Sequence, residues 1–377
     1  MRLLARLILL SVLLSVSFSV ASRAQEEQSK FKDPEDGAFD ISGLLSSRTG
    51  FLPVFVPITE PAVGFGLGGG VAYFHPRDDV DVAKGLSPSI SVVGGMYTAN
   101  GSWAGFGGHK GIWKDGRIRY TGGGGYGSVN IDYYPDNLGL ELDPVEFNFA
   151  GFGFLQEILF QLGSAPLYIG PTYNFTSLDV TLKLDRETDE GLQQLTTDSR
   201  TAGLGLVMFY NGIDNEFTPN SGIQGKLETK RYADFLGGQY NYWKIRAEGT
   251  GFIGAGESMV LGLHAEGQSS STEAPFWDQP FISLRGIAAM RYVGPTVVTG
   301  EGEIRWDFTT RWSVLGFGGM GVVAETTDGL GNGTSAAAFG AGFRYFLART
   351  FGLRAGIDVA KGPEDWAYYI TIGNRIL

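Results

Sequence analysis

The sequence predicts an all-β protein, a transmembrane antiparallel β-barrel of about 16 strands. From residue 50 to the end, segments that alternate apolar and polar residues recur with turn residues between them. They recur about every 20 residues, which suits a membrane strand of about 9–11 residues and its connection. After the first 24 residues there is no run of about 18 apolar residues, which excludes a helical membrane protein.

The first 24 residues have the pattern of a secretory signal peptide. Arg2 and Arg6 flank the start of an apolar run over residues 7–20, and Ser22 and Ala24 supply small residues at the cleavage positions. The run is shorter than the about 20 residues that a membrane helix needs, so we expect residues 1–24 to be removed. Removing these residues, which include three arginines and no acid, lowers the formal net charge from −11 to about −14.

The composition narrows the class of protein. The acidic balance and the lack of a basic face argue against a nucleic-acid partner. The chain has no Cys, which excludes disulfides and thiolate sites. Gly occurs 58 times, mostly inside strand-like runs, where it marks bends and close backbone approach.

Sixteen strands are expected, and their two faces differ consistently. Lys226 and Glu228 alternate with Leu227, for example, and Glu303 and Arg305 alternate with Ile304. A soluble sandwich would give the same alternation, so the faces alone do not decide between the two folds. The strands are expected at 50–58, 64–75, 87–99, 102–113, 117–127, 145–158, 166–179, 200–211, 222–234, 239–253, 258–268, 295–308, 311–325, 336–347, 350–360 and 365–377.

The lengths of the connections favour the membrane barrel. Numbered from a periplasmic N-terminus, the long connections at 128–144, 184–199 and 269–294 fall on the outer side. Short connections such as 114–116 and 309–310 fall on the inner side, with exceptions in both directions. Long external loops and short periplasmic turns are typical of outer-membrane barrels. The expected division is therefore a signal peptide (1–24), a short periplasmic leader (25–49) and the barrel (50–377).

The sequence also predicts the structure of residues 25–49 and the position of the aromatic residues in the last strand. Residues 25–49 are polar and charged at first, so we expect a flexible leader with a short amphipathic piece, and the alternative is a partial plug of the lumen. In the closing strand, Trp366, Tyr368 and Tyr369 are expected in an interfacial aromatic girdle.

Three motifs resemble those of the Omp85 superfamily, the outer-membrane barrels of the BamA, TamA and D15 surface-antigen type. Leu284-Arg285-Gly286-Ile287 is similar to the [VI]RG[FY] motif and falls between the eleventh and twelfth strands, as the family's sixth external loop does. The segment that contains Asp214, Pro219 and Gly222 is similar to the D-x-R-x-x-x-P-x-x-G turn before the ninth strand. The segment 57–66 resembles the opening hairpin of the barrel, so the resemblance covers residues 50–377.

The resemblance implies a role for the sixth-loop arginine. In the family this arginine folds into the lumen and is held by carboxylates of the twelfth and thirteenth strands, so Arg285 is expected to meet Glu303 or Glu301. The thirteenth strand departs from the family pattern, because the usual Asp is replaced by glycine and methionine at 318–321. Glu216 stands where the turn motif usually has Arg, and the chain ends in Leu377 rather than an aromatic residue.

The function implied by the resemblance is insertion or translocation of protein or lipid at the outer membrane of a Gram-negative-type bacterium. The mechanism would use a weak seam between the first and last strands, at 50–57 and 369–377. The periplasmic POTRA domains of the family do not fit into 25–49, so the expected partners are outer-membrane lipid and a client protein, with a periplasmic helper or a second copy in place of POTRA domains. The alternative is a passive channel or structural barrel, whose lumen would carry mixed charges.

No enzyme activity, cofactor or metal site is expected. Gly64-x-Gly66-x-x-Gly69 matches a dinucleotide fingerprint but opens no helix. His75, His109 and His264 are scattered along the chain, which does not suggest a metal site. The third alternative, a barrel-borne hydrolase, would depend on His109 or His264.

Overall fold

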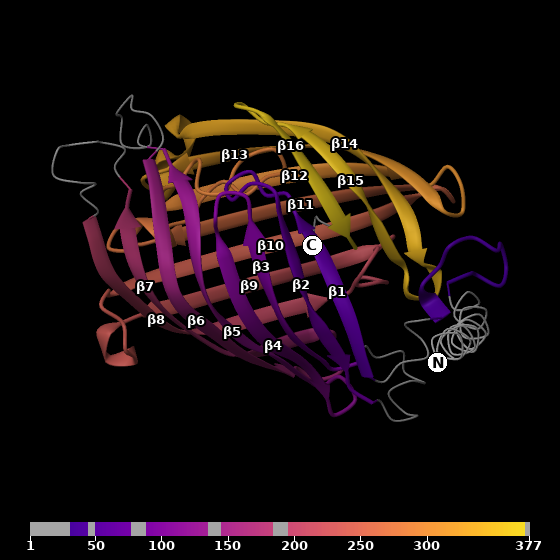
Figure 1. Cartoon of the computed structure of the whole chain (residues 1–377), viewed down its shortest axis with the longest axis horizontal. Helices are drawn as coiled ribbons and strands as arrows, with labels where there is room; N and C mark the ends of the chain where they lie inside the picture. The colour runs from indigo at the N-terminus through magenta and orange to yellow at the C-terminus, as the bar shows by residue number, and fades with distance from the viewer. Residues whose placement is uncertain (1–30, 44–49, 77–87, 135–144, 184–194, 374–377) are drawn as a thin grey trace, which may run out of the picture.

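A computed structural model describes residues 31–43, 50–76, 88–134, 145–183 and 195–373. The predicted signal peptide lies outside the described residues. Figure 1 shows strands that curve around one barrel, with a small N-terminal segment at one end. None of the helices in the described ranges is long and apolar enough to cross a membrane.

The barrel wall is one 16-stranded sheet in which each strand is antiparallel to its neighbours along the chain, as predicted. Chain-neighbour pairing lets short hairpin connections build the whole sheet. The strands are β1 (Gly50–Ile58), β2 (Gly66–Phe74), β3 (Ile90–Thr98), β4 (Trp103–Trp113), β5 (Ile118–Tyr133), β6 (Val145–Gln161), β7 (Leu167–Leu182), β8 (Leu195–Asn211), β9 (Gly222–Tyr232), β10 (Tyr242–Ala255), β11 (Met259–Ser270), β12 (Thr296–Trp306), β13 (Trp312–Ala324), β14 (Thr334–Ala348), β15 (Leu353–Lys361) and β16 (Trp366–Ile372).

The two faces of the wall have the predicted character. On β12, Ile304 and Trp306 are about half exposed, whereas Glu303 and Arg305 between them are buried. The apolar face points outward and the charged face inward, which is the reverse of a soluble sandwich. This inversion is what a barrel in hydrocarbon requires, because the lipid takes the place of the apolar core.

Strands β5 to β8 are longer than the sequence pattern indicated. They have 16 or 17 residues each, and β5 continues six residues past its predicted end at residue 127. Beyond the membrane both faces of a strand meet water, so the apolar alternation fades while backbone pairing continues. The outer connections 128–144 and 184–199 are correspondingly shorter than predicted.

The sheet is not sealed between its first and last strands. Among the described residues no ladder joins β16 to β1, although the two strands approach within 8 Å between Cα atoms. Within the described ranges, β1 and β16 therefore each have one edge that no ladder joins. This pair of edges is the seam discussed below.

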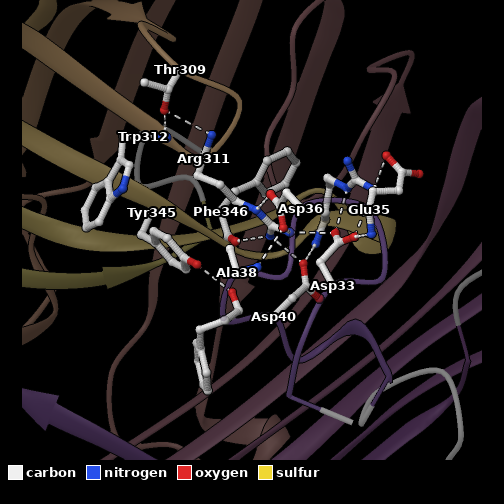
Figure 2. A network of polar contacts seen from close by, with 12 residues as sticks. Asp33, Glu35, Asp36, Ala38, Asp40, Thr309, Arg311, Trp312, Tyr345 and Phe346 are labelled. Carbon is white, nitrogen blue, oxygen red and sulfur yellow. Dashed lines mark hydrogen bonds and ion pairs between the residues drawn. The ribbon is translucent and has the colours of Figure 1, made fainter. Parts of the chain in front are cut away.

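The segment before β1 folds into a hairpin, here called the N-terminal hairpin (residues 31–43). An antiparallel bridge joins Lys32 to Phe39, and the amide of Asp33 donates to the carbonyl of Ala38 at 3.0 Å. Figure 1 places this indigo segment at the ends of the yellow strands β14 and β15. It docks on the β12–β13 and β14–β15 turns at one end of the barrel (Figure 2), whereas the composition suggested a flexible leader.

Candidate functional site

The candidate site is the connection between β11 and β12, here called loop 6 (residues 271–295), which folds into the lumen. Its 3-10 turn η3 (Phe276–Asp278) is tied to β10, where Lys244 lies 2.9 Å from Asp278. Further along, Ile282, Leu284 and Ile287 are buried against inward-facing residues of the wall. Burial of these side chains holds the loop in the barrel, since each contributes about 1.5–3 kcal/mol of hydrophobic stabilisation.

Three carboxylates surround the Arg285 guanidinium. Nε and Nη2 donate to Glu301 Oε1 at 3.0 and 2.6 Å, and Nη1 donates to Asp358 Oδ2 at 3.1 Å. Glu303 Oε2 lies 2.8 Å from Nη2 but makes no hydrogen bond of good geometry. Glu301 and Asp358 therefore hold the arginine by directed bonds, and Glu303 contributes mainly charge.

The third carboxylate comes from β15, a strand that the family pattern did not indicate. Asp358 is fully buried and also accepts a hydrogen bond from Arg344 Nη2 at 2.9 Å. It bridges two buried arginines, which offsets the cost of removing each charge from water. The sequence carried a signal for it, since Arg354 and Asp358 alternate with apolar residues along 353–359. The sequence pattern gave no indication that Arg344 would pair with Asp358.

Strand β13 contributes an aromatic face and space in place of a carboxylate. The Arg285 guanidinium carbon lies 3.5 Å from the centroid of the Phe317 ring, a geometry that favours a cation–π contact. At Gly319 and Gly321 an added Cβ would lie 3.0 Å from Leu284 and 2.6 Å from Ile282. The glycines that replace the usual Asp therefore make room for the apolar residues of loop 6.

Gly286 brings loop 6 against the last strands. Its φ is +96°, and an added Cβ would lie within 3.2 Å of Ala338 and Ala360. Its amide donates to the hydroxyl of Tyr369 at 2.9 Å. Tyr369 thus faces the lumen, and its predicted place in the outer girdle is wrong, because adjacent residues of a strand point to opposite faces. Trp366 and Tyr368 face outward and are exposed.

The second motif closes the turn between β8 and β9. Asp214 Oδ1 accepts from the amides of Asn220 and Ser221 at 2.9 and 3.2 Å, and the carbonyl of buried Pro219 accepts from Arg305 at 3.3 Å. Gly222 has φ +105°, and an added Cβ would lie 2.2 Å from a backbone oxygen. The turn is thereby held to β12.

Glu216, which replaces the usual Arg of this motif, points to cations on the neighbouring wall. It lies 3.5 Å from Lys110 and 3.6 Å from Arg119. The acid therefore joins the turn to β4 and β5.

The histidines lie in two places. Ser91 hydrogen-bonds His75 and His109 at 2.9 Å each, so two histidines that are distant in sequence meet around one serine. His264 lies 2.9 Å from Thr250 and 3.9 Å from Glu266. In the described part of the chain no group of three or more His, Cys, Asp or Glu residues could hold a metal ion.

A cavity of about 420 Å³ remains in the lumen beside loop 6. Arg246, Glu248 and Glu266 line it together with Arg285. Arg246 lies 2.7 Å from Glu248 and 2.9 Å from Glu266. The lumen therefore carries paired charges of both signs, as the alternation predicted.

Comparison with known proteins agrees with the fold. Residues 147–283 match the model of the Omp85 superfamily domain. BamA from Haemophilus ducreyi lacking POTRA domains 1–3 superposes with a TM-score of 0.59 at 13% identity, over 86% of this chain and 70% of that chain. CdiB from Acinetobacter baumannii superposes with a TM-score of 0.55 at 11% identity, over 85% of this chain and 59% of that chain.

CdiB from Escherichia coli gives a TM-score of 0.54 at 12% identity, over 86% of this chain and 62% of that chain. The chain thus spans about 60% of the length of either CdiB structure. No protein in the curated set matches. The chain therefore shares the 16-stranded barrel fold of these proteins, and residues 147–283 are similar to the Omp85 superfamily domain.

Proposed function

We propose that this barrel inserts or translocates protein or lipid at the outer membrane through the seam between β1 and β16. The observation that carries the proposal is that, among the described residues, no ladder joins these two strands, while every other neighbouring pair in the sheet is hydrogen-bonded. The Omp85 domain and the likeness to the BamA and CdiB barrels support the same role.

The seam offers a physical reason for such activity. A ladder of backbone hydrogen bonds holds every other pair of neighbouring strands in the described sheet, so the boundary between β1 and β16, which has none among the described residues, is the weakest line of the wall. An incoming β-strand would gain backbone hydrogen bonds by pairing with either edge. The client that this seam suits best is therefore a chain that itself forms membrane β-strands.

Loop 6 is placed to control what enters the lumen. Arg285 joins it to β12 and β15, and Gly286 joins it to β16. Movement of β16 away from β1 would pull on the hydrogen bond between Tyr369 and Gly286. The loop and the seam are therefore coupled mechanically through β16.

Liposomes test this proposal. The purified barrel should accelerate insertion of a second, unfolded outer-membrane barrel several-fold over empty liposomes, measured by the appearance of the heat-modifiable folded band. A matched control uses liposomes that carry an ordinary porin. If neither insertion nor lipid movement between leaflets exceeds this control, the proposed function is wrong.

A passive channel is the second candidate, and the cavity beside loop 6 is the observation in its favour. A channel needs no seam, so planar bilayers distinguish the two. Steady ohmic conductance that grows in Arg285→Ala would favour the channel. Conductance near background, together with accelerated insertion, would favour the seam.

A further inference from the structure

The lumen has one apolar wall, formed by the inward faces of β1 to β4. Directly paired residues share a face of the sheet, so the ladders carry the inward face of Glu303 on β12 around the barrel to the even-numbered residues of β1 to β4. Within these four described strands, Lys110 is the one charged residue on that face. The others are apolar or small apart from Thr98, and they include Val54, Val56, Val92, Met96, Phe106 and Ile112.

Several side chains of the apolar wall remain exposed. Val56, Val92 and Phe106 are 41%, 37% and 43% exposed, and Leu155 on the inward face of β6 is 37% exposed. On the far side of the lumen, by contrast, loop 6 covers the barrel so closely that its Ile282 is fully buried. Burying an apolar side chain of this size contributes about 1.5–3 kcal/mol. The exposed surface inside the barrel therefore favours binding of an apolar ligand.

Two cations lie beside the apolar wall, near the β4–β5 turn. Lys110 and Arg119 both face the lumen and share one carboxylate, that of Glu216, at 3.5 and 3.6 Å. The side chain of Lys110 is 49% exposed, and the Arg119 guanidinium carbon also lies 4.5 Å from the centroid of the Tyr168 ring. Glu216 accepts a further hydrogen bond from Asn211 at 3.3 Å. Two cations for one acid leave an excess of positive charge, which suits an anionic group such as a phosphate.

The separation of the cations from the far end of the apolar wall matches a phospholipid. Ala104 and Lys110 are six residues apart on the inward face of β4, which is about 20 Å at the rise of a strand. The hydrocarbon core of a bilayer is about 30 Å thick, so the acyl chains of one leaflet reach about 15 Å. A phosphate bound at Lys110 and Arg119 would therefore leave its acyl chains lying along the apolar wall.

An acyl chain suits this wall better than a polypeptide does. The backbone groups of β2 to β4 are already paired in ladders on both sides of each strand. A peptide main chain against these apolar side chains would lose its hydrogen bonds to water without replacement, at a cost of about 1–3 kcal/mol for each group. Hydrocarbon has no such groups, so the wall favours a lipid over a β-strand.

We propose that the inward face of β1 to β4, together with Lys110 and Arg119, is a binding site for an anionic phospholipid. The acyl chains lie against the apolar wall, and the phosphate binds the two cations in place of part of their contact with Glu216. This inference goes beyond the proposed function, because it assigns a lipid to the lumen and does not involve the edges of β1 and β16. Its test measures lipid occupancy and needs neither a client nor transport.

Fluorescence quenching by lipid tests the site. The chain has no Cys, so a single introduced cysteine carries one bimane label. Ala104→Cys places the label on the apolar wall. Gly105→Cys is the matched control on the outward face of the same strand, where an added Cβ meets no atom within 4 Å. Each labelled barrel is reconstituted in phosphatidylcholine liposomes with increasing fractions of phosphatidylglycerol that carries brominated acyl chains, because bromine quenches a label that it contacts.

We expect the Ala104→Cys label to be quenched at a low fraction of brominated lipid. Lys110→Gln with Arg119→Gln should raise the fraction needed for half-maximal quenching about tenfold, since a hydrogen bond to a charged group contributes about 1.5–3 kcal/mol. Quenching of the Gly105→Cys label should stay the same in this variant. Lys183→Gln removes a cation that is paired with Glu146 and should change neither label. If the double variant fails to fold, Lys110→Gln alone should shift the Ala104→Cys label in the same direction by a smaller factor.

Three outcomes would overturn the proposal. In the first, iodide in the buffer quenches the Ala104→Cys label and brominated lipid does not, which indicates a water-filled lumen. In the second, brominated lipid quenches this label equally with and without Lys110 and Arg119. In the third, an unfolded outer-membrane barrel shields the label from iodide while lipid has no effect, which assigns the wall to polypeptide.

The site and the proposed function can fail separately. The expected quenching in a barrel that neither inserts clients nor moves lipid would keep the site and remove only the proposed function. Accelerated insertion without quenching of the Ala104→Cys label would do the opposite.

Discussion

At the scale of single residues, Asp358 is a buried acid whose charge is balanced by two buried arginines. It is fully buried between Arg285 and Arg344 and hydrogen-bonds both. Glu301 can still hold Arg285 if Glu303 is neutralised, because Glu301 makes two of the directed bonds. Asp358, by contrast, is the described carboxylate that hydrogen-bonds both arginines directly.

We therefore predict that Asp358→Asn destabilises the barrel by about 3–5 kcal/mol, the usual cost of removing one partner of a buried ion pair. Glu303→Gln should have a smaller effect and leave loop 6 largely resistant to protease. Asp198→Asn is the control, because Asp198 is exposed and its pair with Arg200 should contribute at most about 1 kcal/mol. Denaturation midpoints and loop proteolysis measure the three variants. Equal losses in Asp358→Asn and Asp198→Asn would contradict the role given to Asp358.

At the scale of elements, loop 6 depends on a close backbone approach as much as on charge. Gly286 lies so near the loop between β15 and β16 that an added Cβ at Gly362 would come 1.9 Å from the Gly286 oxygen. At Gly286 itself φ is +96°, a conformation that costs an L-residue about 1–2 kcal/mol. The arginine motif therefore needs its glycine to bring the loop down to β16.

Gly286→Ala should consequently release loop 6 while leaving every charge in place. We expect faster proteolysis within 271–295 and a stability loss of about 1–3 kcal/mol, from backbone strain and displaced neighbours. Gly331→Ala is the matched control, because an added Cβ there meets no atom within 4 Å. Unchanged proteolysis in Gly286→Ala would show that loop 6 tolerates a looser fit.

The attachment of the N-terminal hairpin has a defined dependence on pH. The hydrogen bond from Arg311 lowers the pKa of Asp36 from 3.8 to about 2. Hydrogen bonds from Ser42 and Arg311 outweigh burial and lower the pKa of Asp40. A lowered pKa stabilises docking above the ordinary value of 3.8 and loses that stabilisation as the pH falls toward about 2.

Docking of the hairpin should therefore be constant from pH 8 to pH 5 and fail between about pH 4 and pH 2. The charged and titratable groups that face the hairpin are Arg311, Arg349 and Tyr345, and both arginines stay charged throughout this range because their carboxylate partners raise the pKa of each. The distance between spin labels on cysteines introduced at Pro34 and Thr310 measures docking of the hairpin, by double electron–electron resonance. Release already at pH 5–6 would indicate that another group controls docking.

The elements also show what the sequence could and could not reveal. Period-2 alternation located all sixteen strands, because in a membrane barrel every strand must keep one face apolar. The same rule failed at the outer ends of β5 and β8, where both faces meet water. It failed again for the pairing of Asp358 with Arg285 across 73 positions, because alternation gives the face of a residue but not its partner across the lumen.

At the scale of the whole molecule, the barrel is one hydrogen-bonded sheet with a single seam in its described part, between β1 and β16. The ladders from β1 through β16 are continuous in the described sheet, and no ladder joins β1 to β16 among the described residues. The N-terminal hairpin is bound to the β12–β13 and β14–β15 turns through Arg311 and Arg349. Insertion of a client through the seam requires β1 and β16 to separate, whereas transport through the lumen does not.

Locking the seam separates these two modes of action. A cysteine pair placed where β1 and β16 approach within 8 Å between Cα atoms would join the two strands by the chain's single disulfide, since no native Cys competes. We predict that oxidation abolishes the accelerated insertion of a second barrel and that reductant restores it, because an incoming strand then finds no edge. The control pair Ala72 and Val92 joins β2 to β3, which are already paired in register at these positions, and its oxidation should leave insertion unchanged. Full activity of the locked barrel would show that clients do not enter through the seam, and a conductance that persists on locking would then assign transport to the lumen.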